Sequence, residues 1–201
     1  MALLISTRHR EGGGRFILSG VRFAVVALLL LGGLQLPAQP VVTKEYQIKA
    51  VFLFNFTQFV EWPTNAFPEA QTPLVIGVLG ENPFGTYLEE TVRGEAVNQH
   101  PLVIQHYRRP EDIKTCHILF VSQSEAGQLN QVFESLKGRN ILTVGDAESF
   151  AQQGGMIRFV TEKNKIHLRI NLAAAKAADL TISSKLLRPA EIVAPSGKAG
   201  P

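Results

Sequence analysis

A long apolar stretch from Glu45 to Pro63, EYQIKAVFLFNFTQFVEWP, dominates the pattern of hydrophobic and polar positions along the chain. Its many apolar residues leave few positions for a polar face, and a helix that is apolar on most sides is normally buried. Gln47, Asn55 and Gln58 lie at helical spacings and would form one narrow polar stripe. The helix is expected to end at Trp62-Pro63, because the residue before a proline is pushed out of the α region. A strand is the alternative for the aromatic-rich middle, but the length of the stretch favours a buried helix around which later strands pack.

After this stretch the chain alternates short apolar runs with helical patterns. The expected strands are 73–79, 102–107, 117–121, 141–144, 156–160 and 166–170. The expected helices are 86–92, 129–136 and 172–178, the last with Asn171 as its N-cap. The last two strands form a hairpin whose alternation is typical of a sheet edge with one solvated face. Strands alternating with helices, followed by a hairpin, predict an α/β fold: a single-domain mixed β-sheet flanked by helices on both faces.

The first 38 residues have the pattern of a secretory signal peptide. A basic region with four arginines precedes an apolar core from Phe23 to Leu34. Leu36-Pro37-Ala38 then has the small-residue character of an acceptable cleavage site. The alternative is an uncleaved membrane anchor, since residues 16–36 contain only one charge, Arg22. A spanning helix needs about 20 apolar residues, and the uninterrupted run here is shorter. We therefore expect cleavage after Ala38 and export to the periplasm.

The remaining 163 of the 201 residues are enough for one domain with one core. Residues 39–44 are expected to form an exposed arm, residues 45–193 the α/β domain, and residues 194–201, APSGKAGP, a disordered tail.

The positive net charge of the whole chain comes from its first 38 residues and does not describe the rest of the protein. The net charge is +3, but four of the 20 Lys and Arg and only one of the 17 Asp and Glu lie in the first 38 residues, so the rest has 16 of each. Nucleic-acid binding needs clustered Lys and Arg. The balance of charges therefore argues against a nucleic-acid partner.

Cys116 is the only cysteine, which excludes an intramolecular disulfide. In an oxidising compartment a lone thiol is buried, reactive or paired between chains. Cys116 is flanked by His117 and an apolar run, so a buried core thiol is the simplest interpretation.

No catalytic constellation is evident. The loop that contains Gly80 and Asn82 does not have GxGxxG spacing and lacks the GK[ST] of a phosphate-binding loop, so a turn after a strand explains it. Such a loop, at the carboxyl end of a strand and ahead of a helix, can still collect an anion or a small ligand.

Other reactive side chains are also better explained without catalysis. Ser183-Ser184-Lys185 does not meet S-x-x-K, and the two serines are expected to cap the following turn. The histidines lie on separate elements without HxxxH or HExxH spacing. Glu61 beside Trp62 could act as an acid, but no partner carboxylate is identifiable. We therefore expect no catalytic residue, cofactor or metal.

Four polar or aromatic residues remain as candidates for recognition. Asn55 in its aromatic helix is expected to hold neighbouring backbone, with a ligand contact as the minority interpretation. Trp62 either closes the core or presents its indole to a partner. For Asn171 and Lys185, two interpretations remain open: each either caps a helix or takes part in recognition at the surface.

Several motifs together resemble the YfiR family of bacterial periplasmic proteins. The motifs occur in the expected order across residues 45–193: KAVFLFNFTQFVEWP at 49–63, PLVIGVLGENPFG at 73–85, CHILFVS at 116–122, ILTVGD at 141–146, GGMIRFV at 154–160 and INLAAAKAADLTISSKLLRPAEIV at 170–193. The better-studied members contain disulfides, which a single Cys116 cannot form within the chain. Redox control of the kind that those members suggest is therefore not carried over.

This resemblance implies a role that composition cannot supply. YfiR-like proteins are periplasmic regulators, and the best-known type binds the periplasmic sensor domain of a membrane diguanylate cyclase, a GGDEF protein, and holds the cyclase inactive. The resemblance thus implies a non-enzymatic repressor of cyclic-di-GMP synthesis and of biofilm formation. The alternative is a small-ligand-binding sensor that acts through another membrane protein, and a periplasmic hydrolase is the least supported class. A homodimer is an assembly that the sequence leaves open.

Overall fold

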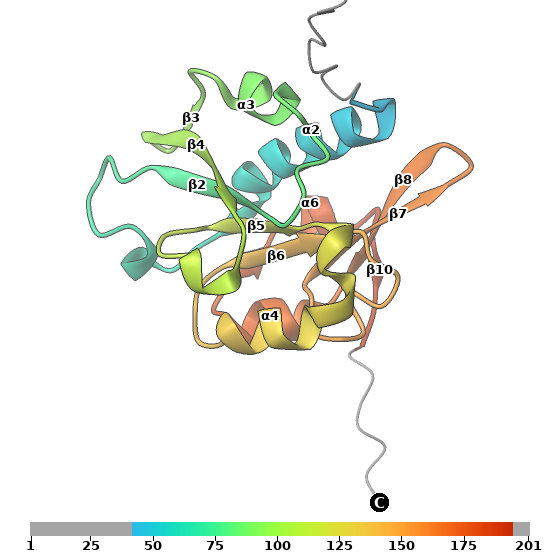
Figure 1. Cartoon of the computed structure of the whole chain (residues 1–201). Coiled ribbons are helices and arrows are strands. Elements are labelled where there is room, and N and C mark those ends of the chain that lie inside the picture. Colours follow the sequence, from blue (N-terminus) through green and yellow to red (C-terminus); the bar gives the residue numbers. More distant parts are fainter. Residues whose placement is uncertain (1–41, 195–201) are drawn as a thin grey trace, which may run out of the picture. The chain divides into compact units, whose positions relative to one another are not determined.

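The computed structural model describes residues 42–194, and its first helix is the predicted one (Figure 1). Helix α2 runs from Lys44 to Phe59 and begins where the Thr43 hydroxyl accepts a hydrogen bond from the backbone N–H of Tyr46. Lys44, assigned to the exposed arm from the sequence, is thus already helical. The predicted signal peptide lies outside the described residues, as does the predicted tail beyond residue 194.

Helix α2 ends before the predicted Trp62-Pro63 boundary. A two-residue strand, β1 (Val60–Glu61), follows Phe59 directly and pairs antiparallel with β9 (Thr181–Ile182). The backbone N–H of Ser183 also donates to the carbonyl of Phe59 at 2.8 Å. Pairing with a distant segment therefore overrides the local helical pattern by a few residues.

One face of α2 is more exposed than its composition suggested. Ile48 and Val51 are 47% and 41% exposed, and Gln58 is exposed on the same side. Gln58 belongs to the narrow polar stripe that the sequence predicted, and Val51 lies on the same stripe, whereas the exposure of Ile48 was not expected. Conversely, Lys49 is only 2% exposed, a burial that the sequence analysis did not anticipate.

A mixed eight-stranded sheet forms the centre of the described residues. Its strand order is β10-β8-β7-β6-β5-β2-β4-β3, and the five strands from β7 to β4 in this order are parallel. The strands are β2 (Leu74–Leu79), β3 (Ala96–Val97), β4 (His100–Tyr107), β5 (Ile118–Val121), β6 (Leu142–Gly145), β7 (Ile157–Glu162), β8 (Lys165–Ile170) and β10 (Glu191–Ile192). The hairpin of β7 and β8 forms as predicted, but β10 pairs with β8, so the hairpin is not the edge.

Helices cover both faces of this sheet, which confirms the predicted α/β fold. Along β5, Ile118 and Phe120 pack into the apolar cluster under α2, whereas Leu119 and Val121 pack into a second cluster with residues of α4. In Figure 1, α2 lies above the sheet and α4 below it. The further helices are α3 (Tyr87–Val92), α4 (Leu129–Ser135), α5 (Leu172–Ala177) and α6 (Ser184–Leu187), with 3-10 turns η1 (Thr64–Ala66), η2 (Pro110–Asp112) and η3 (Gln123–Gln128).

Because β2, β4, β5 and β6 are parallel, their ends form two shared edges. We call these the carboxyl-terminal edge and the amino-terminal edge. The start of α2 contacts the carboxyl-terminal edge, where the Tyr46 ring lies 5.5 Å from the ring of Phe84, which follows β2. The chain beyond the end of α2 reaches the amino-terminal edge. Within residues 42–194, no helix combines the length and apolar character that crossing a membrane requires.

Candidate functional site

The loop after β2, a predicted candidate for ligand binding, is closed by its own neighbours. Gly80 has φ +87°, and a Cβ there would lie 2.3 Å from the Ser124 hydroxyl oxygen. That hydroxyl accepts a hydrogen bond from the backbone N–H of Glu81 at 3.1 Å. The Asn82 side chain accepts from the N–H of Phe84 and donates to the carbonyl of Gly85. These contacts use the groups that would have bound an anion, and the loop serves as a turn.

A carboxylate makes the same place unfavourable for an anion. Glu125, at the carboxyl end of β5, is 7% exposed, and its Oε1 would lie 2.6 Å from a Cβ on Gly80. Its side chain is held by Ser124, whose hydroxyl lies 3.0 Å away, and by the Gln128 amide.

A buried ion pair lies at the same edge. Lys49 Nζ donates to Oδ2 of Asp146 at 2.6 Å and lies 2.5 Å from Oε1 of Glu45. The Tyr46 hydroxyl donates to the same Asp146 oxygen at 3.0 Å, and its ring lies 4.4 Å below the ammonium. Burial, together with Asp146, raises the pKa of Tyr46, whereas the hydrogen bond from Lys49 lowers the pKa of Glu45. The cluster fixes α2 to the carboxyl end of β6.

The sequence analysis missed this pair. A lysine within an apolar stretch is rarely buried without a partner of opposite charge. The position of Lys49 within an apolar stretch could therefore have predicted an acidic partner. The sequence did not identify that partner, because Asp146 is 97 residues away and directly follows β6, where a turn residue is expected.

The amino-terminal edge, in contrast, is hollow. A cavity of about 520 Å³ opens there between the end of α2, the loop that follows it and the start of β4. We call it the Trp62 cleft. It is lined by Thr57, Val60, Glu61, Trp62, Thr64, Phe67, Pro68, Glu69, Ala70, Leu74, Val97, Asn98 and His100.

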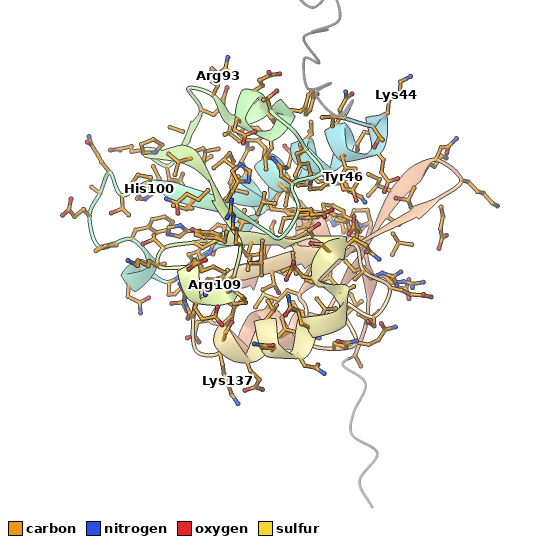
Figure 2. All side chains as sticks on the ribbon, viewed as in Figure 1. Lys44, Tyr46, Arg93, His100, Arg109 and Lys137 are labelled. Atoms are coloured by element: carbon orange, nitrogen blue, oxygen red, sulfur yellow. The ribbon has the colours of Figure 1, made fainter. Side chains whose placement is uncertain are left out.

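Four rings meet beside this cleft. Phe67 is stacked between His100, at 4.1 Å between ring centroids, and His117, at 4.5 Å. Trp62 is 6.4 Å from Phe67 and 6.3 Å from His117, with its plane at 80° and 79° to theirs. Because Trp62 is about equally far from the stacked rings of Phe67 and His117, it lies beside the stack. Trp62 therefore forms a wall of the cleft that is separate from the stacked rings. Figure 2 shows His100 and Tyr46 on opposite sides of the view, which separates the cleft from the ion pair.

His117 fastens the loop after α2 to the sheet. It is 2% exposed; its Nδ1 accepts from the backbone N–H of Val75 at 3.0 Å, and its Nε2 donates to the carbonyl of Ala66 at 3.1 Å. These two bonds specify a neutral imidazole with the proton on Nε2. Burial lowers the pKa of His117, and the nearby His100 adds to this effect. The histidines lie on separate elements, as expected, yet Phe67 brings two of them together.

The structure divides the predicted recognition residues. Glu61 and Trp62 line the cleft, and the indole Nε1–H donates to the carbonyl of His117 at 3.3 Å. Asn171 is 1% exposed and caps α5 by accepting from the N–H of Ala174, so it offers no surface for recognition. Lys185 is exposed on α6 and is not among the lining residues of the cleft, and its backbone N–H donates to the Ser183 hydroxyl that caps the helix.

Asn55 does not have the predicted role. Its side chain is half-buried, and none of the hydrogen bonds among residues 42–194 involves it. It shares the partly exposed side of α2 with Val51. A buried amide would have needed hydrogen bonds to neighbouring backbone, which was the expected role. Because Asn55 is partly exposed, its side chain does not need such partners within the protein.

Cys116 is the buried thiol that the sequence predicted. It is 7% exposed, and its Sγ donates to the carbonyl of Ile118 at 3.1 Å. Burial raises the pKa of the thiol to about 12. Among the described residues, His, Cys, Asp and Glu side chains nowhere form a group of three that could hold a metal ion.

Comparison with known proteins adds a family. The sequence profile of a family described as YfiR/HmsC-like matches residues 46–191, which includes both edges of the sheet. Proteins of this family are periplasmic, are generally regulatory rather than catalytic, and are linked to cyclic-di-GMP signalling. No curated protein matches the chain significantly.

Proposed function

Because the chain belongs to the YfiR/HmsC-like family, we propose that it represses a membrane diguanylate cyclase by binding the periplasmic sensor domain of that enzyme. The observation that carries the proposal is the match over residues 46–191, almost the whole of the described residues. Binding that holds the cyclase inactive would lower cyclic-di-GMP and surface attachment. Such a role requires a contact surface and no turnover by the protein itself.

We further propose that this contact includes Trp62. The indole is half-buried beside an open cleft, so it combines a large apolar area with accessible surface. Tryptophan is enriched among the residues that dominate binding energy at protein interfaces. The neighbouring Glu61 is exposed and belongs to the same rim.

Export by a cleaved signal peptide is part of the proposal. N-terminal sequencing of protein from a periplasmic extract should find Gln39 as the first residue. Membrane-embedded protein that begins at Met1 or Ala2 would instead establish an anchor.

Deletion of the gene tests the repressor role. The deletion strain should show higher cyclic-di-GMP and stronger surface attachment, and periplasmic expression of the protein should reverse both. Affinity capture from membranes, followed by mass spectrometry, should recover a GGDEF protein. Unchanged cyclic-di-GMP in a deletion strain that expresses such a protein would refute repression.

Substitution of Trp62 tests the contact. Trp62→Ala should weaken binding to the captured cyclase by about 30-fold if the indole is a dominant contact. Ile192→Ala is a matched control, because Ile192 is 51% exposed on β10, at the opposite end of the strand order from β3 and β4. The melting temperature of both variants must be measured, since a loss of folding would also abolish binding. A folded Trp62→Ala protein with unchanged affinity would exclude Trp62 from the interface.

The cleft also favours a second function, a sensor for a small ligand. A hollow of about 520 Å³ with aromatic and apolar walls is within the common size range of ligand sites, roughly 300 to 1,000 Å³. In this alternative, ligand occupancy rather than constant repression would control the membrane partner.

A further inference from the structure

We infer that the Trp62 cleft binds a small organic cation, an ammonium or guanidinium group carried on an apolar body. The inference goes beyond the proposed regulation and does not depend on which membrane protein is the partner. It rests on three features of the cleft: its charge, its free aromatic surface and its apolar walls.

The charged side chains of the cleft all have one sign. Glu61 and Glu69 line it, and no Lys or Arg is among its lining residues. Both glutamates are exposed, and neither forms an ion pair with another residue of 42–194. Each glutamate thus adds a formal negative charge to the lining that no cation of the described residues balances. The cleft therefore attracts a positive charge and repels a negative one.

Trp62 supplies the aromatic surface for such a charge. Both faces of Phe67 are covered by the imidazoles of His100 and His117. Trp62 lies beside that stack and remains half-exposed. A cation over an indole face is attracted by the negative π surface, and Trp is the strongest of the aromatic side chains in this respect.

His100 does not reverse this preference. Its Nδ1 lies 2.8 Å from the carbonyl of Thr72, which can only accept, so Nδ1 carries a proton and donates there. That donor is therefore not available to an anionic ligand. Val60, Leu74 and Val97 complete the lining with apolar surface, which fits the body of the ligand rather than its charge.

A neighbouring hollow shows that the charge is specific to the cleft. Behind the loop after α2, a cavity of about 350 Å³ is lined by Lys114 and Arg139 but by no carboxylate. The Arg139 guanidinium is already bonded to the carbonyls of Ile113 and Lys114, at 2.8 and 3.0 Å. The two hollows thus have opposite charge, and a cation would select the Trp62 cleft.

The test uses intrinsic fluorescence, because Trp62 is the only tryptophan of the chain. The full exported protein is titrated with phenethylammonium and, separately, with 3-phenylpropionate, an anion of similar size. Probes this small bind weakly, so the titration extends to about 20 mM. A saturable change with the cation, at an affinity at least about tenfold higher than for the anion, is expected.

Variants then assign the effect to the carboxylates. Glu61→Gln and Glu69→Gln should each weaken binding of phenethylammonium about twofold to fivefold, the usual range for exposed charges. Glu81→Gln, at the opposite edge of the sheet, is the matched control and should leave the affinity unchanged. Trp62→Phe, followed by calorimetry, should weaken binding about twofold or more.

Three results would overturn the inference: no saturation up to about 20 mM, equal affinity for the anion, or affinity unaffected by both glutamate substitutions. None of these readouts involves a cyclase. Failure of cation binding would leave repression intact, and unchanged cyclic-di-GMP in the deletion strain would leave cation binding intact.

Discussion

The two edges of the parallel strands are built in opposite ways. The carboxyl-terminal edge holds the Lys49–Asp146 ion pair and the Ser124–Glu125 contacts around Gly80. The amino-terminal edge holds the open Trp62 cleft. In open α/β sheets, ligands usually bind outside the carboxyl ends of the strands, where the strand order reverses. Here the side chains of the protein itself occupy that place, and the hollow is at the other end.

The charged side chains of the two edges differ in how they are bonded within the protein. At the carboxyl-terminal edge, Lys49 is 2% exposed and its ammonium is bonded to Asp146 and Glu45. At the amino-terminal edge, Glu61 and Glu69 are exposed residues of the cleft lining, and neither forms an ion pair with another residue of 42–194. Substitutions at the carboxyl-terminal edge should therefore change stability, whereas substitutions of the two exposed glutamates of the cleft should change binding.

The largest expected effect on stability is at Lys49. Lys49→Met keeps the length of the side chain but leaves Asp146 buried beside no cation, which should lower the free energy of unfolding by about 3 to 5 kcal/mol. Urea denaturation measures this loss. The double variant Lys49→Met/Asp146→Asn removes the unpaired charge and keeps an acceptor for Tyr46, so it should recover most of the stability. A loss below about 1 kcal/mol for Lys49→Met would mean that the edge is not held by this pair.

A smaller effect is expected at Gly80. Gly80→Ala introduces a Cβ at φ +87° that would lie 2.3 Å from the Ser124 oxygen, so strain and crowding both oppose it, and the expected cost is about 2 to 3 kcal/mol. Gly94→Ala is the matched control. It has φ +76° with no atom within 4 Å of the new Cβ, so only the strain of about 1 kcal/mol remains. Equal losses for the two variants would show that the contacts around Gly80 contribute nothing.

At the amino-terminal edge, His117 should make stability depend on pH. Its pKa is lowered in the folded protein, so on acidification the unfolded chain, with an imidazole pKa of about 6.5, takes up the proton first. At a pH well above about 6.5, His117 has no effect on the free energy of unfolding. As the pH is lowered below that value, the free energy of unfolding falls by up to about 1.4 kcal/mol per pH unit, until the pKa of His117 in the folded protein is reached. Urea denaturation between pH 7.5 and 5 measures the slope, and an NMR titration assigns it. A His117 pKa at or above about 6.5, the value of an unperturbed imidazole, would contradict the prediction.

The smallest observable change is expected when the native protein is exposed to a thiol reagent, because Cys116 is buried. A pKa of about 12 leaves about one thiolate in ten thousand at pH 8, so the native protein should react with a thiol reagent only slowly. The same reaction in urea should be fast. Cys116→Ser should cost about 1 to 3 kcal/mol, at the lower end if its hydroxyl takes over the bond to the Ile118 carbonyl. Rapid labelling of the native protein, or a Cys116-linked dimer on a non-reducing gel, would contradict burial.

The features that the sequence predicted correctly depend on local patterns. Within the apolar run 73–79, Leu74–Leu79 forms β2 with every residue of the strand buried. Asn171 caps α5 because an N-cap depends on residues of its own turn. The two-residue strands β1, β3 and β9 are too short to show such a pattern. Strands β1 and β9 are defined by pairing with each other across more than 100 residues, and β3 by a tight hairpin with the start of β4. They were accordingly missed.

The candidate site was predicted only in part for the same reason. Trp62 and Glu61 were identified because they are adjacent in the sequence and lie at the end of a helix. The stack of Phe67 with His100 and His117 depends on the start of β4, the turn before β5 and a loop, which no sequence spacing connects. Side chains that converge from three elements give no periodic signal.

The antiparallel pairing of β1 with β9 also sets the order in which the cleft is completed. Val60, a wall of the cleft, pairs with Ile182, and Phe59 accepts its hydrogen bond from Ser183. A chain is synthesised from its N-terminus, and pairing over such a separation waits for the distant partner. All other lining residues of the cleft lie before residue 101. A partly synthesised chain, or one truncated before residue 181, therefore contains the residues of the cleft without the strand that pairs with its wall.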